Sequence, residues 1–388
     1  MRARGWAVVV GVLVLLSAGR RAAAELEDDE EDDARVDLHG FVSQGLLLST
    51  ANDYLAKSHR GSVEFTEAAL NVSRSFGHHL RIAMQLFSRD LGPLGNYRLR
   101  FDWFLLDYRH ADWLGLRVGR VKVPFGLYND TSDYDPARVQ VLLPQSVYPT
   151  TSRDFLLAVT GAEVYGRAPL GPAGALEYRL YGGTTFVDLA DSSGTPGLTV
   201  TSVDVPYTAG GRLLWEPIEG LRLGGSVLAT KIDFSAQAGS MSVALRLPAV
   251  LWVASAEYAH LRYRFAAEYS RWLVDLESSQ PALVPPVSRE SERGYVSGTY
   301  ETSDWFALGL YYSLDFPDVS HRDGRRDRYQ HDVAASVRID LHPHWLLKLE
   351  AHFMNGTAEL SPTLNDNRPR ETLERYWGFF AVKTTAYF

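Results

Sequence analysis

Residues 345–354 read WLLKLEAHFM, and their side chains alternate between two chemical classes. One set of every second residue is wholly apolar: Trp345, Leu347, Leu349, Ala351 and Phe353. The set between them carries the charged and polar groups Lys348, Glu350 and His352. Successive side chains of a β-strand point to opposite faces, so this stretch predicts a strand with one apolar and one polar side.

The same alternation recurs along most of the chain. It is clear in 332–341 and in 262–270, and it predicts an all-β fold. Sixteen segments can be placed, although fourteen or eighteen also fit the pattern, because boundaries read from sequence err by about two to four residues. The sixteen predicted strands are approximately 36–49, 61–74, 79–89, 97–109, 113–123, 156–167, 174–187, 207–217, 220–232, 249–259, 261–275, 290–300, 305–316, 329–341, 344–357 and 373–388.

The connections between these segments differ in length in a regular way. After even-numbered segments they are tight, as at 76–78 and 342–344. After odd-numbered segments they are mostly long and polar, and the examples are 188–206, 233–248, 276–289 and 358–372. A soluble β-sandwich also shows alternation, but this asymmetry is typical of transmembrane antiparallel barrels with short periplasmic turns and long extracellular loops.

The composition agrees with a barrel whose outer face meets lipid and whose inner face meets water. Hydrophobic residues make up 46% of the chain and aromatic residues 12%, yet the mean hydropathy is −0.15. A closed barrel satisfies every backbone hydrogen bond between neighbouring strands and leaves no open edge in the membrane. Cysteine is absent, which excludes thiol catalysis, cysteine-ligated zinc and iron–sulfur chemistry.

The N-terminal region divides into two short segments before the barrel at 36–388. Residues 1–24 combine a basic start, a short apolar run and the small residues Ala22, Ala23 and Ala24, which predicts a cleaved secretory signal peptide. Residues 25–35 contain eight acidic side chains between Glu25 and Asp33. Such a segment has too few apolar groups to pack, so we expect it to be disordered. Without it, the body of the chain is nearly balanced in charge.

The last predicted strand ends the chain on an aromatic residue. Residues 376–388 read YWGFFAVKTTAYF and close on Phe388. This ending resembles the C-terminal signature by which bacterial outer-membrane proteins are recognised for barrel assembly. The resemblance implies that Phe388 is an assembly signal, and that the chain meets the barrel-assembly machinery and outer-membrane lipid in a Gram-negative bacterium. The basic run from Arg322 to Arg328 lies in a predicted outside loop, where we expect contact with anionic lipopolysaccharide.

A second stretch carries a resemblance to a known family. Residues 115–128 read GLRVGRVKVPFGLY, and a strand that ends in this way resembles bacterial porins of the phosphate-selective porin O and P family. The resemblance implies sixteen strands, a third outside loop folded into the lumen, and a homotrimer. Here that loop is 124–155, the longest predicted connection. The implied function is a water-filled channel for passive diffusion of small ions and polar solutes.

The charges assigned to the lumen are mixed in sign, so the substrate of that family is not carried over. A pore lined by charges of both signs orients polar solutes without strongly favouring either cations or anions. The predicted lumen-lining residues are Arg100, Asp102, Arg179, Arg262, Arg264, Glu268, Lys348 and Glu350. The predicted pore constriction consists of Arg120 and Lys122 on the strand and Asp130, Asp133 and Asp135 on the loop.

Other functional classes find little support in the sequence. Residues 129–135 are rich in oxygen ligands but lack the full EF-hand pattern. We predict no catalytic, cofactor-binding or metal-binding residue, and binding to nucleic acid is not expected for an exported acidic chain. Two alternatives to a pore stay open. One is a closed barrel with a structural or surface-binding role, and the other is an outer-membrane hydrolase.

Overall fold

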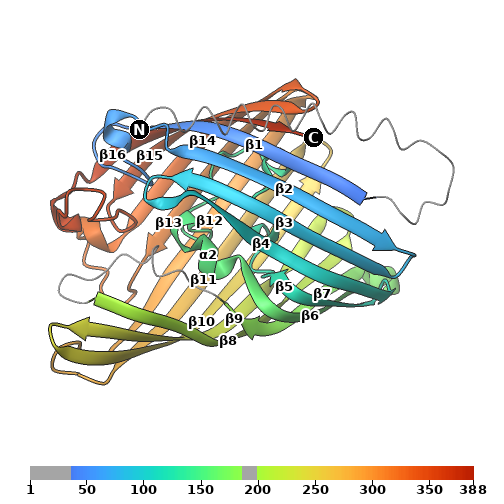
Figure 1. Ribbon diagram of the computed structural model, residues 1–388. Coiled ribbons are helices and arrows are strands. Elements are labelled where there is room, and N and C mark those ends of the chain that lie inside the picture. The colour runs from blue at the N-terminus through green and yellow to red at the C-terminus, as the bar shows by residue number, and fades with distance from the viewer. Residues whose placement is uncertain (1–35, 186–198) are drawn as a thin grey trace.

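The computed structural model describes residues 36–185 and 199–388 as one closed antiparallel barrel, in which each strand pairs with its neighbours in sequence and β1 pairs with β16 (Figure 1). The strands are β1 (Val36–Ser49), β2 (Phe65–Phe76), β3 (Leu80–Leu91), β4 (Leu94–Ala111), β5 (Leu114–Lys122), β6 (Ala158–Pro169), β7 (Ala175–Thr184), β8 (Thr199–Ile218), β9 (Leu221–Ala238), β10 (Met241–His260), β11 (Tyr263–Ser278), β12 (Val287–Ser303), β13 (Phe306–Phe316), β14 (Gln330–His342), β15 (Trp345–Gly356) and β16 (Tyr376–Tyr387). The predicted sixteen-strand barrel is therefore confirmed.

One predicted loop was wrong, and a second was wrong over the part of it that the structure describes. The stretch 233–248 was expected to be a long loop, but β9 and β10 stay paired up to Met241 and Ala238, so only a tight turn remains. Residues 199–206 belong to β8, and the rest of the predicted loop 188–206 lies outside the described residues. Both stretches were predicted as loops because of their polar composition. Polar residues also form β-strands where the sheet continues beyond the membrane.

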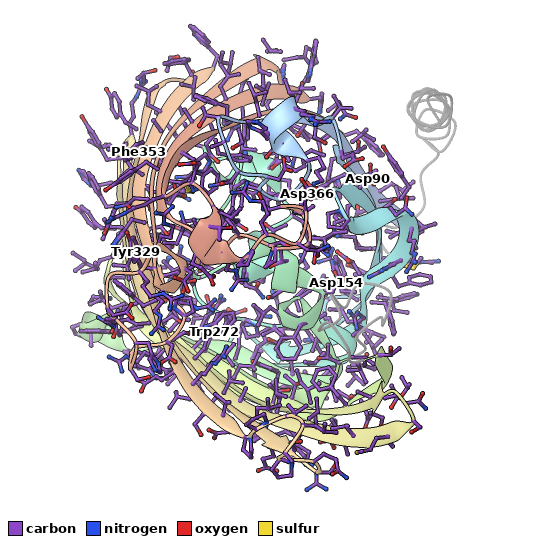
Figure 2. All side chains as sticks on the ribbon, turned by 90° about the vertical axis from the view of Figure 1, so that its left-hand side faces the viewer. Asp90, Asp154, Trp272, Tyr329, Phe353 and Asp366 are labelled. Carbon is purple, nitrogen blue, oxygen red and sulfur yellow. The ribbon has the colours of Figure 1, made fainter. Side chains whose placement is uncertain are left out.

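Burial follows the alternation along each strand. On β15, Leu349 and Phe353 are 39% and 58% exposed, whereas Lys348 and Glu350 between them are 0% and 3% exposed. Figure 2 is viewed from the end with the long loops and shows Phe353 pointing away from the wall. The apolar side chains therefore cover the outside of the barrel, and the charged ones lie inside it, as lipid on one side and a polar lumen on the other require.

Exposed tryptophans gather at the end of the barrel that carries the short turns. Trp113, Trp215, Trp305 and Trp345 are all at least 41% exposed, and each lies in or close to such a turn. Amphipathic rings at this level form the interfacial girdle of membrane barrels. Within the described residues, no helix has both the length and the apolar character that crossing a membrane requires.

The chain end closes the seam between β1 and β16. The Phe388 N–H donates to the Gly40 carbonyl at 3.0 Å, and the Gly40 N–H donates to the Phe388 carbonyl at 3.2 Å. The Phe388 ring also lies over Gly40, where an added Cβ would be only 2.8 Å from two ring carbons. The last residue thus contributes both a hydrogen-bonded pair and a ring contact to barrel closure.

Deletion of Phe388 is expected to lower the amount of folded barrel severalfold, because the seam loses a backbone pair and its aromatic cover. The measurement is the heat-modifiable band on a gel run without boiling. Phe388→Tyr keeps the ring and serves as the matched control. Equal amounts of folded barrel in all three proteins would show that the terminal ring has no part in assembly. The predicted segments 1–24 and 25–35 lie outside the described residues.

Candidate functional site: a loop across the barrel lumen

The connection between β5 and β6 lies inside the barrel, in agreement with the expectation for 124–155. This inner loop, residues 123–157, contains three short 3-10 turns and the single-turn helix α2 (Arg153–Leu156), which Figure 1 places within the ring of strands. Its hydrogen bonds reach walls far apart around the ring. The Gly126 N–H donates to Ser226 on β9 at 2.8 Å, and the Leu142 N–H donates to Glu350 on β15 at 3.0 Å.

The sequence at 123–126 explains why the chain leaves the wall here. The Val123 N–H still donates to the Leu157 carbonyl at 2.9 Å, which continues the pairing of β5 with β6 by one backbone hydrogen bond. Pro124 has no N–H to continue the ladder. Gly126 has φ +60°, and a Cβ there would be 2.4 Å from the Tyr148 hydroxyl oxygen. Only glycine adopts this conformation without strain in so close an approach.

An apolar cluster anchors the first part of the loop to one side of the barrel. Phe125, Leu127 and Val147 pack with Leu228 of β9 and Leu251 of β10, and all are nearly or fully buried. These wall residues are inward-facing apolar side chains, and a second buried apolar cluster includes Phe65 of β2, Leu91 of β3 and Phe379 of β16. Their burial against the loop gives a hydrophobic contribution that a water-filled wall could not supply.

Glu268 of β11 organises the same region through hydrogen bonds. Its carboxylate accepts from the Leu127 N–H at 2.9 Å, from the Tyr295 hydroxyl at 2.9 Å, and from the Tyr148 hydroxyl. Burial and the adjacent Glu268 carboxylate raise the pKa of Tyr148 well above its usual value, so its hydroxyl remains a donor. A buried carboxylate with this many donors is a strong positional anchor.

Asp135, in the middle part of the inner loop, attaches it to the side of the barrel opposite β9 to β11. Its carboxylate lies 2.7 Å from the Lys383 Nζ, 3.5 Å from the Lys348 Nζ and 3.1 Å from an Arg138 nitrogen, and it accepts from Thr385 at 2.7 Å. Burial alone would raise the pKa of Asp135, but the three cations outweigh it and hold that pKa far below the usual value. The residue is only 1% exposed, so it serves to hold the loop in place.

The other predicted constriction residues are also paired. Lys122 lies 3.5 Å from Asp133 and donates to the Asp130 carbonyl at 2.9 Å. Asp133 accepts from Arg153 at 2.8 Å, and the Asp130 carboxylate pairs with Arg179 and Arg212. Lys122, Asp130 and Asp133 are therefore brought together, whereas Arg120 donates to the Asp102 carbonyl at 2.8 Å and Asp135 contacts other strands.

Most of the predicted lumen-lining residues also form contacts within the barrel. Arg100 lies 2.7 Å from Asp154 of the inner loop, and Figure 2 places Asp154 inside the ring of strands. Asp102 pairs with Arg153, and Arg179 pairs with Glu163 and Asp130. Lys348 donates to the Asp135 and Gln140 carbonyls at 2.8 and 3.0 Å. Glu268 and Glu350 accept from loop N–H groups, as described above.

Two residues of that group differ from the rest. Arg262 lies in the short turn after β10 and donates to the Thr302 carbonyl at 2.6 Å, which places it at the end of the barrel. Arg264 borders a cavity, and its side chain makes no hydrogen bond or ion pair with any described residue. Arg212 was not predicted from the sequence, although it pairs with Asp130 and Glu177. A charged residue among the apolar residues of β8 was the feature of the sequence that could have indicated it.

Two cavities lie beside the inner loop in the lumen. The larger, of about 210 Å³, lies between the loop and the inner faces of β11, β12 and β14. The smaller, of about 70 Å³, lies between the loop and residues of β2, β3 and β16. Arg138 and Leu143 line both cavities, so these two loop residues separate them. Within the described ranges, no group of three or more His, Asp or Glu side chains is placed to hold a metal ion.

A closed sixteen-strand antiparallel barrel with its third long connection folded inward is the architecture of outer-membrane porins. No family model matches the chain, and no curated protein does. Three solved structures of the same fold can be named. OmpT of Vibrio cholerae, described as expressed in the outer membrane, has a TM-score of 0.59 at 12% identity, over 93% of this chain and all of that one.

The other two structures are likewise from bacteria. The outer membrane channel DcaP of Acinetobacter baumannii has a TM-score of 0.55 at 12% identity, over 93% of this chain and 99% of that one. The anion-selective porin from Comamonas acidovorans has a TM-score of 0.54 at 12% identity, over 91% and 99%. At this level of identity, the likeness shows a shared fold.

Proposed function

We propose that the protein is an outer-membrane porin that forms a water-filled channel for passive diffusion of small ions and polar solutes. The observation that carries this proposal is the lumen itself, in which a folded loop leaves two cavities lined by charged and polar side chains. A sixteen-strand barrel is wide enough to hold water through its centre. The apolar outer face and the porin-like fold support a location in the outer membrane.

A closed barrel with a surface-binding role is the second candidate, because one observation favours it. The inner loop forms hydrogen bonds to strands around the whole lumen, including β9, β11 and β15. Such a loop could block the passage instead of narrowing it. The two candidates differ in whether ions pass, and not in fold.

Single-channel recording on the purified barrel in planar lipid bilayers tests the proposal. A porin gives stable, discrete conductance steps in potassium chloride, and a homotrimer, the assembly that we also propose, gives steps in groups of three. A barrel that inserts, as shown by its heat-modifiable band in recovered vesicles, and yet passes no steady current would reject the pore and leave the closed barrel.

The orientation of the barrel gives a separate prediction. A peptide tag inserted after Ala282, in the connection between β11 and β12, is expected to bind antibody on intact cells, because long connections lie outside the cell. The matched control is the same tag after Pro343, in the short turn between β14 and β15. That tag is expected to be accessible only after the outer membrane is broken. The reverse pattern would show that the barrel inserts the other way round.

A further inference from the structure

The larger cavity contains a positive charge that the protein leaves without a partner. Arg264 projects from the inner face of β11 and is exposed, and neither a hydrogen bond nor an ion pair joins its guanidinium to a described residue. The cations around the loop are different. Lys348, Lys383, Arg153 and Arg179 each pair with buried carboxylates. A solute in the lumen therefore meets the guanidinium of Arg264 as a free binding group.

The other charged groups of this cavity are weaker ligands for a solute. Arg338 pairs with Asp340 at 2.9 Å and also donates to the Pro136 carbonyl. Arg138 pairs with Asp135 and donates to the Ser132 and Val141 carbonyls. The carboxylate of Glu301 also borders the cavity and has no partner among the described residues. A negative solute is thus attracted at Arg264 and repelled at Glu301.

Besides these charged groups the lining has four polar residues, Thr131, Gln140, Ser297 and Thr299, and an apolar or aromatic part. The apolar or aromatic part includes Pro136, Val139, Leu143 and Pro144 from the loop, together with Tyr128 and Tyr295. The Tyr128 hydroxyl donates to Glu257 at 2.7 Å, and the Tyr295 hydroxyl donates to Glu268 at 2.9 Å. Neither glutamate lines the cavity. Because both hydroxyls are engaged elsewhere, these tyrosines offer a solute mainly ring surface.

We propose that this cavity is a binding site for small monocarboxylates with an apolar or aromatic body, and that Arg264 holds their carboxylate. A free guanidinium binds a carboxylate with two parallel hydrogen bonds, which gives both strength and orientation. The apolar lining takes the body of the solute. The cavity volume of about 210 Å³ corresponds to roughly seven water molecules at their liquid volume, which is enough room for a single-ring carboxylate.

The same features disfavour a small, doubly charged anion such as hydrogen phosphate. That anion has no apolar part to place against Tyr128, Pro144 and Leu143, and a second charge would increase the repulsion by Glu301. Replacing its hydration shell also requires several free donors, whereas Arg264 supplies the one unpaired cation of the lining. The role in passage rests on the proposed pore function, but binding itself does not.

The test uses benzoate as the probe and the intact barrel in detergent micelles. Isothermal titration calorimetry measures benzoate affinity for the unchanged protein and for Arg264→Ala, Glu301→Gln and Arg262→Ala. Arg264→Ala is expected to weaken binding about tenfold to a hundredfold, the range for hydrogen bonds to a charged group. Glu301→Gln is expected to strengthen it, because a repelling charge is removed. Arg262→Ala, outside the cavity, is the control and should leave affinity unchanged.

Folding of each variant is checked by the heat-modifiable band, and Arg264→Ala should fold normally because that side chain has no bonding partner to lose. Equal benzoate affinity in Arg264→Ala and the unchanged protein would overturn the inference, as would tighter binding of phosphate than of benzoate. Block of chloride conductance by benzoate in planar bilayers adds the link to passage. Benzoate binding without any conductance would reject the proposed pore but support the binding site. Failure of the pore proposal can therefore be distinguished from failure of the binding-site proposal.

Discussion

Replacing Asp135 with alanine is expected to cause the largest loss of stability of any single change in the lumen. The substitution leaves Lys348, which is 0% exposed, without a carboxylate partner among the described residues. Lys383 keeps Glu67 at 2.6 Å, so it is less affected. Removing one partner of a buried ion pair costs about 3–5 kcal/mol because the remaining charge stays buried. The inner loop should then detach from β15 and β16.

Two measurements follow this effect. The temperature at which the heat-modifiable band is lost should fall in Asp135→Ala, and the inner loop should become sensitive to limited proteolysis. The matched rescue is Asp135→Ala combined with Lys348→Met, which removes the orphaned charge together with its partner and should recover much of the loss. If the double variant is no more stable than the single one, the buried charge is not the cause.

The pH dependence of this anchor follows from the lowered pKa of Asp135. A carboxyl whose folded pKa lies below its unfolded value contributes stability above the unfolded value and loses it only as pH falls through the folded one. The pKa of Asp135 is held far below the usual value by Lys383, Lys348 and Arg138, which outweigh burial. The loop should therefore stay attached from pH 7 to pH 4, and Asp135→Asn should mimic what only extreme acid achieves.

The barrel could be predicted from the sequence because its determinants are local. Alternation at 345–354 depends only on the period of a strand, and the inward position of Lys348 and Glu350 follows from it directly. Proline and glycine at 124 and 126 marked the point where the chain leaves the wall. The strand ends of β9 and β10 were missed because polar residues above the membrane look the same in a loop and in an extended hairpin.

The partners of the loop acids could not be predicted in the same way. Asp135 was assigned to an open constriction opposite Arg120 and Lys122, but it pairs with Lys348 and Lys383 from strands more than two hundred residues later. Pairing across a lumen depends on how far the loop reaches, and no local pattern encodes that distance. The lack of a side-chain partner for Arg264 could not be predicted from the sequence either. An arginine occupies the same position in the alternation of a strand whether or not its side chain is hydrogen-bonded.

Deletion of residues 129–137 from the inner loop is expected to raise single-channel conductance roughly twofold, because the segment occupies the lumen between two cavities. The apolar anchor formed by Phe125, Leu127 and Val147 remains, so the shortened loop keeps its attachment to β9 and β10. The control is a deletion of 281–285 in the connection between β11 and β12, which we expect to lie outside the cell. This deletion should leave conductance unchanged. Equal conductance in both deletions would show that the inner loop does not limit flow.

The same deletion is also expected to change ion preference toward anions. It removes Asp130, Asp133 and Asp135, while the cations that they neutralise stay on the wall, among them Arg212 and Lys348. Unpaired cations beside a water-filled path attract anions and repel cations. The reversal potential under a potassium chloride gradient should therefore shift toward the chloride equilibrium potential. Lys348→Glu in the shortened protein restores a negative charge and should reverse that shift. If neither the deletion nor Lys348→Glu changes the reversal potential, the permeating ions follow a path away from these strands.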